Sequence, residues 1–192
     1  KIMKYIIGIA VLMLTACSSV PDKAYYQLPD VYQGANNKVV TTTESAKQDQ
    51  IWIQPIRLSD MLVNTGIVYQ TSDINYTVAN QHLWINPLDQ QLQQNLVVGL
   101  AKEFPNRVVS TQPIEDKLAK LTVNVNYFQG RYDGKVIIAG DWIYTQGNKV
   151  ISQPFSVALT QTEDGYPALV RTLGEGWQNV VAEIAKTIKS QY

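Results

Sequence analysis

Cysteine and histidine, which often serve as nucleophile and base in enzymes, each occur once in the 192-residue chain, as Cys17 and His82. A thiol beside an imidazole can form a covalent intermediate, so this pair is the first candidate for chemistry. A single cysteine forms no internal disulfide and no thiolate zinc cluster, and a single histidine excludes any site that needs two imidazoles. The role of Cys17 therefore depends on the residues around it.

Carboxylates offer a second possible chemistry, because two of them can act together as general acid and base. They must then lie within a few ångström in a pocket, and nothing in the spacing of the acids requires this. Asp133 has a predicted turn role, and Asp89 lies in the first turn of a predicted helix, where a negative charge favours the macrodipole. Asp73 and Asp141 are isolated along the chain. The chain has no GxSxG elbow, Walker loop or zinc motif, so we predict no enzyme, no metal site and no cofactor.

The residues before Cys17 predict a secretion signal. Lys1 and Lys4 give a positive start, and residues 6–14 are an apolar run about half as long as a membrane-spanning helix. A buried core helix is the alternative interpretation. However, an apolar run behind lysines that ends at small residues is how secretory signals are built. We therefore predict that residues 1–16 are a cleaved signal peptide.

The sequence Leu14-Thr15-Ala16-Cys17 looks like a bacterial lipobox. The resemblance implies that Cys17 becomes the first mature residue and carries an S-diacylglycerol group and an N-acyl chain such as palmitate. One acyl chain anchors a protein only marginally, at about 0.8 kcal/mol per buried methylene, so three chains would anchor it firmly. Ser18 stands where an Asp would suggest inner-membrane retention, which points to the periplasmic face of the outer membrane. A thioether sulfur is no nucleophile, which disfavours catalysis by Cys17 and His82.

Overall charge and size limit the class of protein further. Sixteen Lys and Arg residues balance sixteen Asp and Glu residues, so the chain lacks the basic footprint of a nucleic-acid binder. Hydrophobic residues make up 45% of the chain, and its length suffices for one domain with a real core.

Hydrophobic periodicity predicts the order of strands and helices. One helix should run from Asn86-Pro87, with Asn86 as N-cap, to Phe104, because leucines repeat every four residues between them. A second should span about 167–189, with an apolar stripe. The strand candidates are 24–29, 51–56, two short strands within 66–79, 107–110, 121–128, 135–144 and 149–160. This order predicts an α/β fold: a single layered domain whose central mixed sheet has helices packed on it.

Two connecting segments carry predictions of their own. Asp133-Gly134 lies between two strand candidates and predicts a type I′ hairpin turn, in which both central residues have positive φ. Residues 30–49 contain few large apolar side chains, and we interpret them as a flexible loop that lets the domain stand off the membrane. Residues 17–29 would then be the lipidated N-terminus with a short strand, and residues 50–192 the α/β domain.

Aromatic residues in polar surroundings are the best candidates for contacts with other molecules. Trp84 is predicted to lie in a polar loop just before a helix, where it could contact a partner subunit or a membrane surface. The hairpin of Tyr132, Asp133 and Gly134 is a second candidate. The alternative for the hairpin is that Asp133-Gly134 only closes a turn, and we expect Trp52, Trp142 and Trp177 to pack in the core.

Several stretches together resemble a known family. They are YYQLP at 25–29, GIVYQTSDINY at 66–76, LWINPLDQQL at 83–92 and FQGRYDGKVIIAGDW at 128–142. With the lipobox and the closing Trp-containing helix, they are similar to the ABC-transport auxiliary lipoproteins over essentially the whole mature chain. The resemblance implies an α/β sandwich like that of anticodon-binding domains, although a fold alone does not imply a function.

The resemblance also implies a function and partners. Such lipoproteins sit on the inner leaflet of the outer membrane, plausibly as a ring of identical subunits. They cooperate with an integral inner-membrane protein and with an MCE-domain protein that spans the periplasm, in a system that moves lipids between membranes. We therefore expect a non-enzymatic docking lipoprotein. The alternatives are a periplasmic lipid-binding carrier and, third, an envelope hydrolase.

Overall fold

The computed structural model describes residues 22–29, 50–114 and 118–191. The predicted signal peptide, Cys17 and the 30–49 segment lie outside the described residues, so lipidation of Cys17 stays a prediction. The elements are β1 (Ala24–Tyr26), β2 (Gln50–Ile53), β3 (Arg57–Leu58), the 3-10 helix η1 (Asp60–Leu62), β4 (Gly66–Gln70), β5 (Tyr76–Trp84), α3 (Leu88–Glu103), β6 (Val108–Ser110), β7 (Ala119–Arg131), β8 (Lys135–Gln146), β9 (Lys149–Thr160) and α4 (Tyr166–Lys189). They confirm the predicted fold class, a mixed sheet with helices packed on it.

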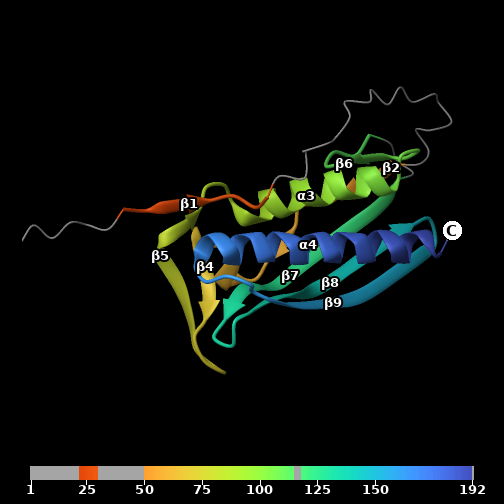
Figure 1. Cartoon of the computed structure of the whole chain (residues 1–192). Helices are drawn as coiled ribbons and strands as arrows, with labels where there is room; N and C mark the ends of the chain where they lie inside the picture. Colours follow the sequence, from red (N-terminus) through yellow and green to blue (C-terminus); the bar gives the residue numbers. More distant parts are fainter. Residues whose placement is uncertain (1–21, 30–49, 115–117, 192) are drawn as a thin grey trace, which may run out of the picture.

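Strand β7 organises the sheet, because it has neighbours along both edges (Figure 1). On one edge it pairs antiparallel with β8, and β8 pairs in turn with β9. On the other edge it pairs parallel with β2, β3 and β4 in succession, at residues 119–121, 124–125 and 130–131. Strand β6 continues the sheet beyond β2, whereas β5 and then β1 continue it beyond β4. The two ends of β7 therefore have different surroundings.

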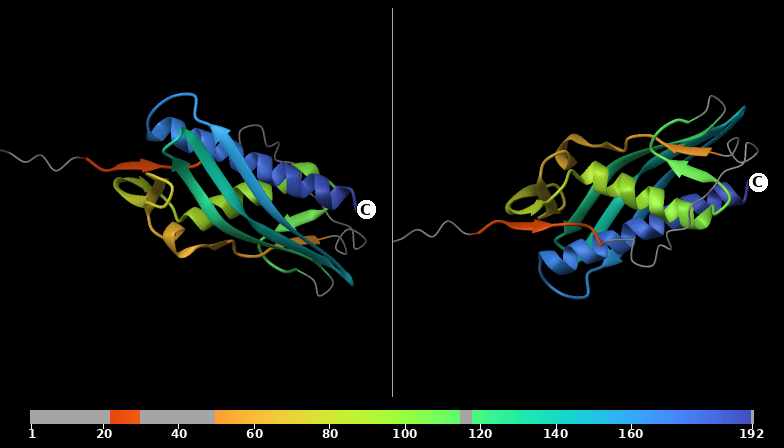
Figure 2. Two further views of the ribbon diagram at one scale, coloured as in Figure 1. Left: turned by 90° about the horizontal axis from the view of Figure 1, so that it is seen from below. Right: turned by 90° about the horizontal axis from the view of Figure 1, so that it is seen from above.

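Helices α3 and α4 lie next to each other on one face of the sheet (Figure 2). The indole Nε1–H of Trp177 in α4 donates a hydrogen bond to the backbone oxygen of Leu92 in α3, at 3.1 Å. Every fourth residue of α3 from Leu88 to Leu100 is buried, as the leucine repeat predicts. The core between sheet and helices also contains Leu121, Val123, Val125, Phe128, Ile138, Trp142, Tyr144, Leu173, Trp177, Val180 and Ile184.

Helix α3 begins one residue later than predicted. Pro87 is its N-cap, with extended backbone angles of φ −49° and ψ 133°, and Leu88 is the first helical residue. Asn86 makes no side-chain capping bond; instead its backbone oxygen accepts a hydrogen bond from Nε2 of Gln91, at 2.8 Å. The predicted N-cap role of Asn86 is therefore wrong. The N-cap is Pro87, and the side chain of Gln91 binds the backbone oxygen of Asn86.

The turn between β7 and β8 also differs from the prediction. No non-glycine residue in the described part of the chain has positive φ, so Asp133 cannot occupy a type I′ position. The backbone N–H of Gly134 donates to the oxygen of Arg131 at 3.0 Å, and Gly134 alone takes the left-handed conformation, with φ 75°. This is a type I turn followed by a left-handed glycine, the usual three-residue hairpin loop.

Strand β1 changes the interpretation of the N-terminal region. It pairs in parallel with β5, matching Ala24 with His82 and Tyr26 with Trp84, so it belongs to the same sheet as the rest of the domain. Residues 30–49 therefore connect two strands of one sheet and do not separate the anchor from the domain. The prediction that they set the stand-off from the membrane is wrong, because the domain already begins at Ala24.

Close packing within the sheet gives a prediction about stability. Gly140 pairs with Val125 beside the register shift in β7, and a Cβ added there would lie 2.0 Å from the backbone oxygen of Asn124. We expect Gly140→Ala to lower the free energy of unfolding by about 3 kcal/mol, because a backbone atom cannot move aside. Urea denaturation measures this change.

Gly134→Asn is the matched control for this substitution. A Cβ at Gly134 meets no atom within 4 Å, and asparagine tolerates a left-handed backbone better than other side chains. We expect a loss below about 1 kcal/mol. A Gly140→Ala variant that is as stable as the control would contradict the packing described for β7 and β8.

Candidate functional site

Trp84, the first predicted contact residue, lies in the core. It is the last residue of β5 rather than part of a polar loop, and its side chain is only 5% exposed. Its ring centroid lies 6.2 Å from that of Phe128 in β7. The interpretation of Trp84 as an exposed contact residue is therefore wrong. The polar residues before it resemble a loop in the sequence because they occupy a half-exposed strand.

His82, the only histidine, joins β1 to α4. Its Nδ1 lies 3.0 Å from the hydroxyl of Tyr26, and its ring stacks on Tyr166 with centroids 3.7 Å apart and planes 13° from parallel. Burial raises the pKa of the Tyr166 phenol above its ordinary value, with a smaller contribution from Tyr26. The imidazole thus links the strand nearest the predicted anchor to the first turn of α4, which is a structural role.

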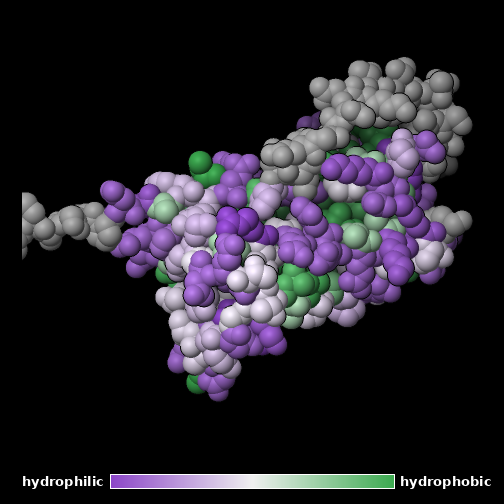
Figure 3. All heavy atoms as spheres, in the orientation of Figure 1, coloured by the Kyte–Doolittle hydropathy of each residue, from purple (hydrophilic) through white to green (hydrophobic). Residues whose placement is uncertain are grey.

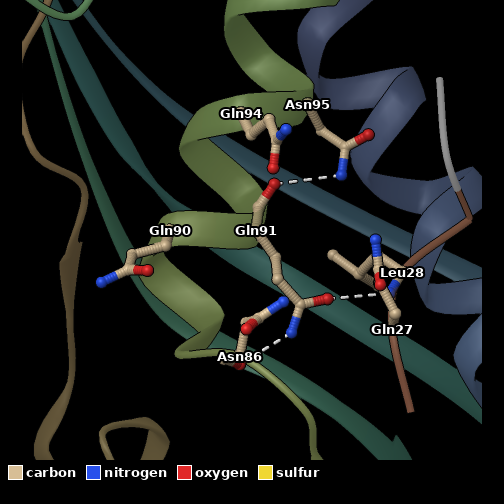
Figure 4. A pocket seen from close by; sticks show the side chains of 7 residues that line it. All are labelled: Gln27, Leu28, Asn86, Gln90, Gln91, Gln94 and Asn95. Carbon is tan, nitrogen blue, oxygen red and sulfur yellow. Dashed lines mark hydrogen bonds between the residues drawn. The ribbon is translucent and has the colours of Figure 1, made fainter. Parts of the chain in front are cut away.

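Gln91 fixes the chain just after β1. Its Oε1 accepts a hydrogen bond from the backbone N–H of Leu28 at 2.8 Å, while its Nε2 donates to the backbone oxygen of Asn86 (Figure 4). The side chain is almost fully buried, as is Leu28. Next to Leu28, Pro29 packs on Gly174 of α4, where an added Cβ would lie 2.6 Å from the proline Cδ. Both helices therefore hold the segment that follows β1.

A polar pocket of about 240 Å³ lies beside this contact. It is lined by Gln27, Leu28, Asn86, Gln90, Gln91, Gln94 and Asn95. Figure 4 shows Gln91 reaching towards Leu28 and Asn86, whereas Gln90 points away from them. The lining residues offer amide donors and acceptors but no titratable group, so the pocket supplies neither a general acid nor a general base.

The predicted hairpin contact at 132–134 lies at the surface. Tyr132 is 54% exposed, and Asp133 forms a bidentate ion pair with Arg131, in which Arg131 Nε donates to Oδ1 at 2.8 Å. This hydrogen bond lowers the pKa of the Asp133 carboxyl to about 2 and raises the pKa of the Arg131 guanidinium. The hairpin is thus accessible, and its role as a contact stays a prediction.

A second hairpin ends beside the first. Gln70 of β4 pairs with Arg131 of β7 on one side and with Tyr76 of β5 on the other. Tyr76 is 42% exposed, and Ile74 in the β4–β5 turn is 78% exposed. The tips of the two hairpins together form a surface that we call the hairpin end. It consists of Ile74, Tyr76, Arg131, Tyr132 and Asp133. Sequence reasoning identified Tyr132 and Asp133 but missed Ile74 and Tyr76.

In the part of the chain that the structure describes, no group of three or more His, Cys, Asp or Glu side chains could hold a metal ion. Of the four aspartates considered as acids, Asp141 accepts a hydrogen bond from Asn124 Nδ2 at 2.7 Å, and Asp133 pairs with Arg131. Within the same residues, no helix is long and apolar enough to cross a membrane.

Gln91 and His82 have structural roles that the sequence did not reveal. Gln91 follows Leu88 by three residues, so it faces the core on the same side of α3 as the leucines. The place of Gln91 on the apolar face of α3 is the one signal in the sequence that it makes a buried contact, because a buried polar side chain needs a hydrogen-bond partner. The partners of His82 come from β1 and α4, and no local pattern predicts such a contact.

The chain is similar to known proteins over nearly its full length. The model of the family described as ABC-type transport auxiliary lipoprotein component matches residues 26–185. Two curated relatives, each an "Intermembrane transport lipoprotein PqiC", come from Escherichia coli strain K12 and Shigella flexneri. Each is 41% identical over 187 residues, which cover 97% of this chain and 97% of the relative.

Solved structures show the same architecture. The crystal structure of an uncharacterised protein, 38% identical, has a TM-score of 0.76 and covers 88% of this chain and 99% of its own. A Xanthomonas campestris protein, only 17% identical, has a TM-score of 0.67 over 88% of this chain and 99% of its own, and shows the fold alone. These comparisons support the resemblance that the sequence motifs predicted.

The Gln91 contact gives a prediction for β1. Gln91→Ala removes the acceptor of the buried Leu28 N–H, which should lower the free energy of unfolding by about 1–3 kcal/mol. It should also speed hydrogen exchange at the Leu28 amide, which two-dimensional NMR measures. Gln90→Ala, at the exposed neighbouring position, is the control and should change stability by less than about 0.5 kcal/mol. Equal exchange at Leu28 in both variants would refute the role of Gln91.

The hairpin ion pair gives a prediction about pH. Because the pKa of Asp133 is about 2 in the folded protein and 3.8 ordinarily, the pair stabilises the folded state above pH 3.8 and loses this effect as the pH falls towards 2. NMR titration of the Asp133 carboxyl should show this low pKa. Arg131→Gln should return the pKa towards 3.8, since it removes the largest cause of the shift. An unchanged pKa in that variant would exclude Arg131 as the cause.

Proposed function

The chain belongs to the family of ABC-type transport auxiliary lipoprotein components, and on this premise we propose that it is a non-enzymatic outer-membrane lipoprotein of an intermembrane lipid transport system. In this proposal it docks a periplasm-spanning MCE-domain protein to the outer membrane. The observation that carries the proposal is the 41% identity to PqiC lipoproteins over 97% of both chains. The lipobox before Cys17 supplies the means of attachment.

The proposed partners follow from the family and from the names of the relatives. The MCE-domain protein would be PqiB-like, and an integral inner-membrane partner would be PqiA-like. The chain itself would assemble as a homo-oligomeric ring on the periplasmic face of the outer membrane. Such a complex would move lipid between the membranes and so maintain membrane integrity. The balanced charge of the chain supports protein and membrane partners rather than nucleic acid.

Two structural observations support docking over the alternatives. The residues that sequence analysis weighed as catalytic are engaged elsewhere, because His82 stacks on Tyr166 and Asp133 pairs with Arg131. This argues against an envelope hydrolase. The space between sheet and helices is filled by large side chains, among them Trp142 and Trp177, each 1% exposed. That packing argues against a lipid carrier, which needs an apolar chamber of about 300–1,000 Å³.

Removal of the lipid-bearing cysteine tests the proposal. We expect Cys17→Ala to leave a folded domain that no longer fractionates with the outer membrane and no longer supports lipid transport, because its three acyl chains are lost. Ser19→Ala, two residues away and outside the lipobox, should retain both properties. Membrane fractionation and envelope-integrity assays measure the two outcomes. A Cys17→Ala chain that stays in the outer membrane would refute the anchoring mechanism.

Crosslinking distinguishes docking from the two other functions. A photocrosslinker on the domain surface in intact cells should capture an MCE-domain protein. Native mass spectrometry of the delipidated domain should show an oligomer without bound phospholipid. A retained phospholipid would favour a carrier, and turnover of ester or glycan substrates by the purified protein would favour a hydrolase.

A further inference from the structure

The hairpin end carries large apolar side chains that the core does not need. Ile74, Tyr76 and Tyr132 are exposed, although each comes from a hairpin whose strands are well paired. Both hairpins point the same way, towards the lower left of Figure 1, and Figure 3 shows hydrophobic surface at the tip of this projection among hydrophilic residues. A group of exposed apolar side chains among polar ones can mark a contact with another molecule or with a membrane, whereas a single one is ordinary.

The composition of this end matches the boundary of a bilayer. Tyrosine prefers the headgroup level, where its ring is in an apolar environment and its hydroxyl stays hydrated, and arginine and lysine extend their charges to the same level. Four charged groups lie at this end, and they balance: Asp73 and Asp133 against Arg131 and Lys135. A neutral surface of this kind fits zwitterionic lipid headgroups and does not require anionic ones.

The length of chain between the predicted anchor and β1 sets where the membrane can lie. Cys17 precedes Ala24 by seven residues, which span at most about 25 Å when fully extended. Ala24 pairs with His82, and from this pairing β5 bends away from β1 towards its hairpin with β4 (Figure 1). From His82 to Tyr76 is six residues of strand, about 20 Å. The lipid on Cys17 can therefore be level with the hairpin end, and cannot extend far beyond it.

We propose that the hairpin end inserts its apolar side chains shallowly into the lipid leaflet that holds Cys17. Three side chains on convex tips suit the headgroup boundary, where interfacial segments insert about 5–10 Å. A specific protein interface would need about 800 Å² and roughly 20–30 residues on each partner, whereas the exposed apolar side chains of the hairpin end are Ile74, Tyr76 and Tyr132. The lipid anchor and the hairpin end would then hold the domain in one orientation. The inference rests on the lipid anchor of the proposed function.

The single cysteine makes a direct test possible. In the mature lipoprotein the Cys17 sulfur is a thioether, so a second cysteine can be labelled alone with an environment-sensitive fluorophore. The test uses Ile74→Cys and, as a second site, Tyr132→Cys, in the full-length lipidated protein on vesicles of phosphatidylethanolamine and phosphatidylcholine. Val150→Cys is the control, because Val150 is 64% exposed, between Tyr132 at 54% and Ile74 at 78%, but lies next to the β8–β9 turn at the opposite end of the sheet.

We expect labels at Ile74 and Tyr132 to shift to shorter emission wavelength on vesicles and to be quenched by lipid-borne quenchers, while the label at Val150 stays accessible to iodide. If both hairpin labels behave like the one at Val150 while the protein stays bound to vesicles, the inference is wrong and the anchor stands. Protection only after an MCE-domain protein is added would assign the hairpin end to that protein instead. If the lipidated protein leaves the vesicles, the anchor itself fails, and the inference fails with it.

Discussion

The structure depends on the need of β7 to satisfy its backbone hydrogen bonds along both edges. A central strand of thirteen residues, buried on its inner face, leaves polar groups on either side that must be paired. The long strand β8 satisfies one edge by itself, whereas the other edge is shared by three short strands. Because those short strands pair with successive stretches of β7, each end of β7 has its own set of neighbours. One end receives β2 and β6, and the other receives β4, β5 and β1.

This division places the N-terminal strand and the two exposed hairpins on the same side of the molecule. Strand β1 adds only three residue pairs to the sheet, and such a short parallel pairing is weak alone. Three further contacts reinforce it: the Tyr26 hydroxyl at His82, the Leu28 N–H at Gln91, and Pro29 on Gly174. They come from β5, α3 and α4, so the start of the domain is held by every layer of the fold. A lipid at Cys17 would thus be joined to the rigid domain by a few residues.

Local patterns in the sequence predicted most of the fold, and long-range contacts account for the errors. The four-residue leucine repeat of α3, the apolar stripe of α4 and the alternation in β7 each concern neighbouring positions, so they appear in the sequence and in the structure. Strand β1 lies 58 positions from its partner in β5, and nothing near it shows that it joins the sheet. Trp84 was misplaced for a related reason, since a half-exposed strand with polar outward residues resembles a loop until its partners are known.

The candidate site was predicted only where a turn or a motif marked it. Asp133-Gly134 indicated a hairpin correctly, although the turn is type I followed by a left-handed glycine and not the expected type I′. Ile74 and Tyr76 gave no signal, because exposure of an apolar side chain is a property of the assembled surface. What these residues share is the end of the molecule on which they lie, because Gln70 of β4 pairs with Tyr76 on one side and with Arg131 on the other. In the proposed function, acyl chains supply affinity for the membrane. The contacts that hold β1 in the sheet would then fix the orientation of the domain relative to the membrane. A docking protein needs such an orientation, because its partner must approach from the opposite side of the periplasm.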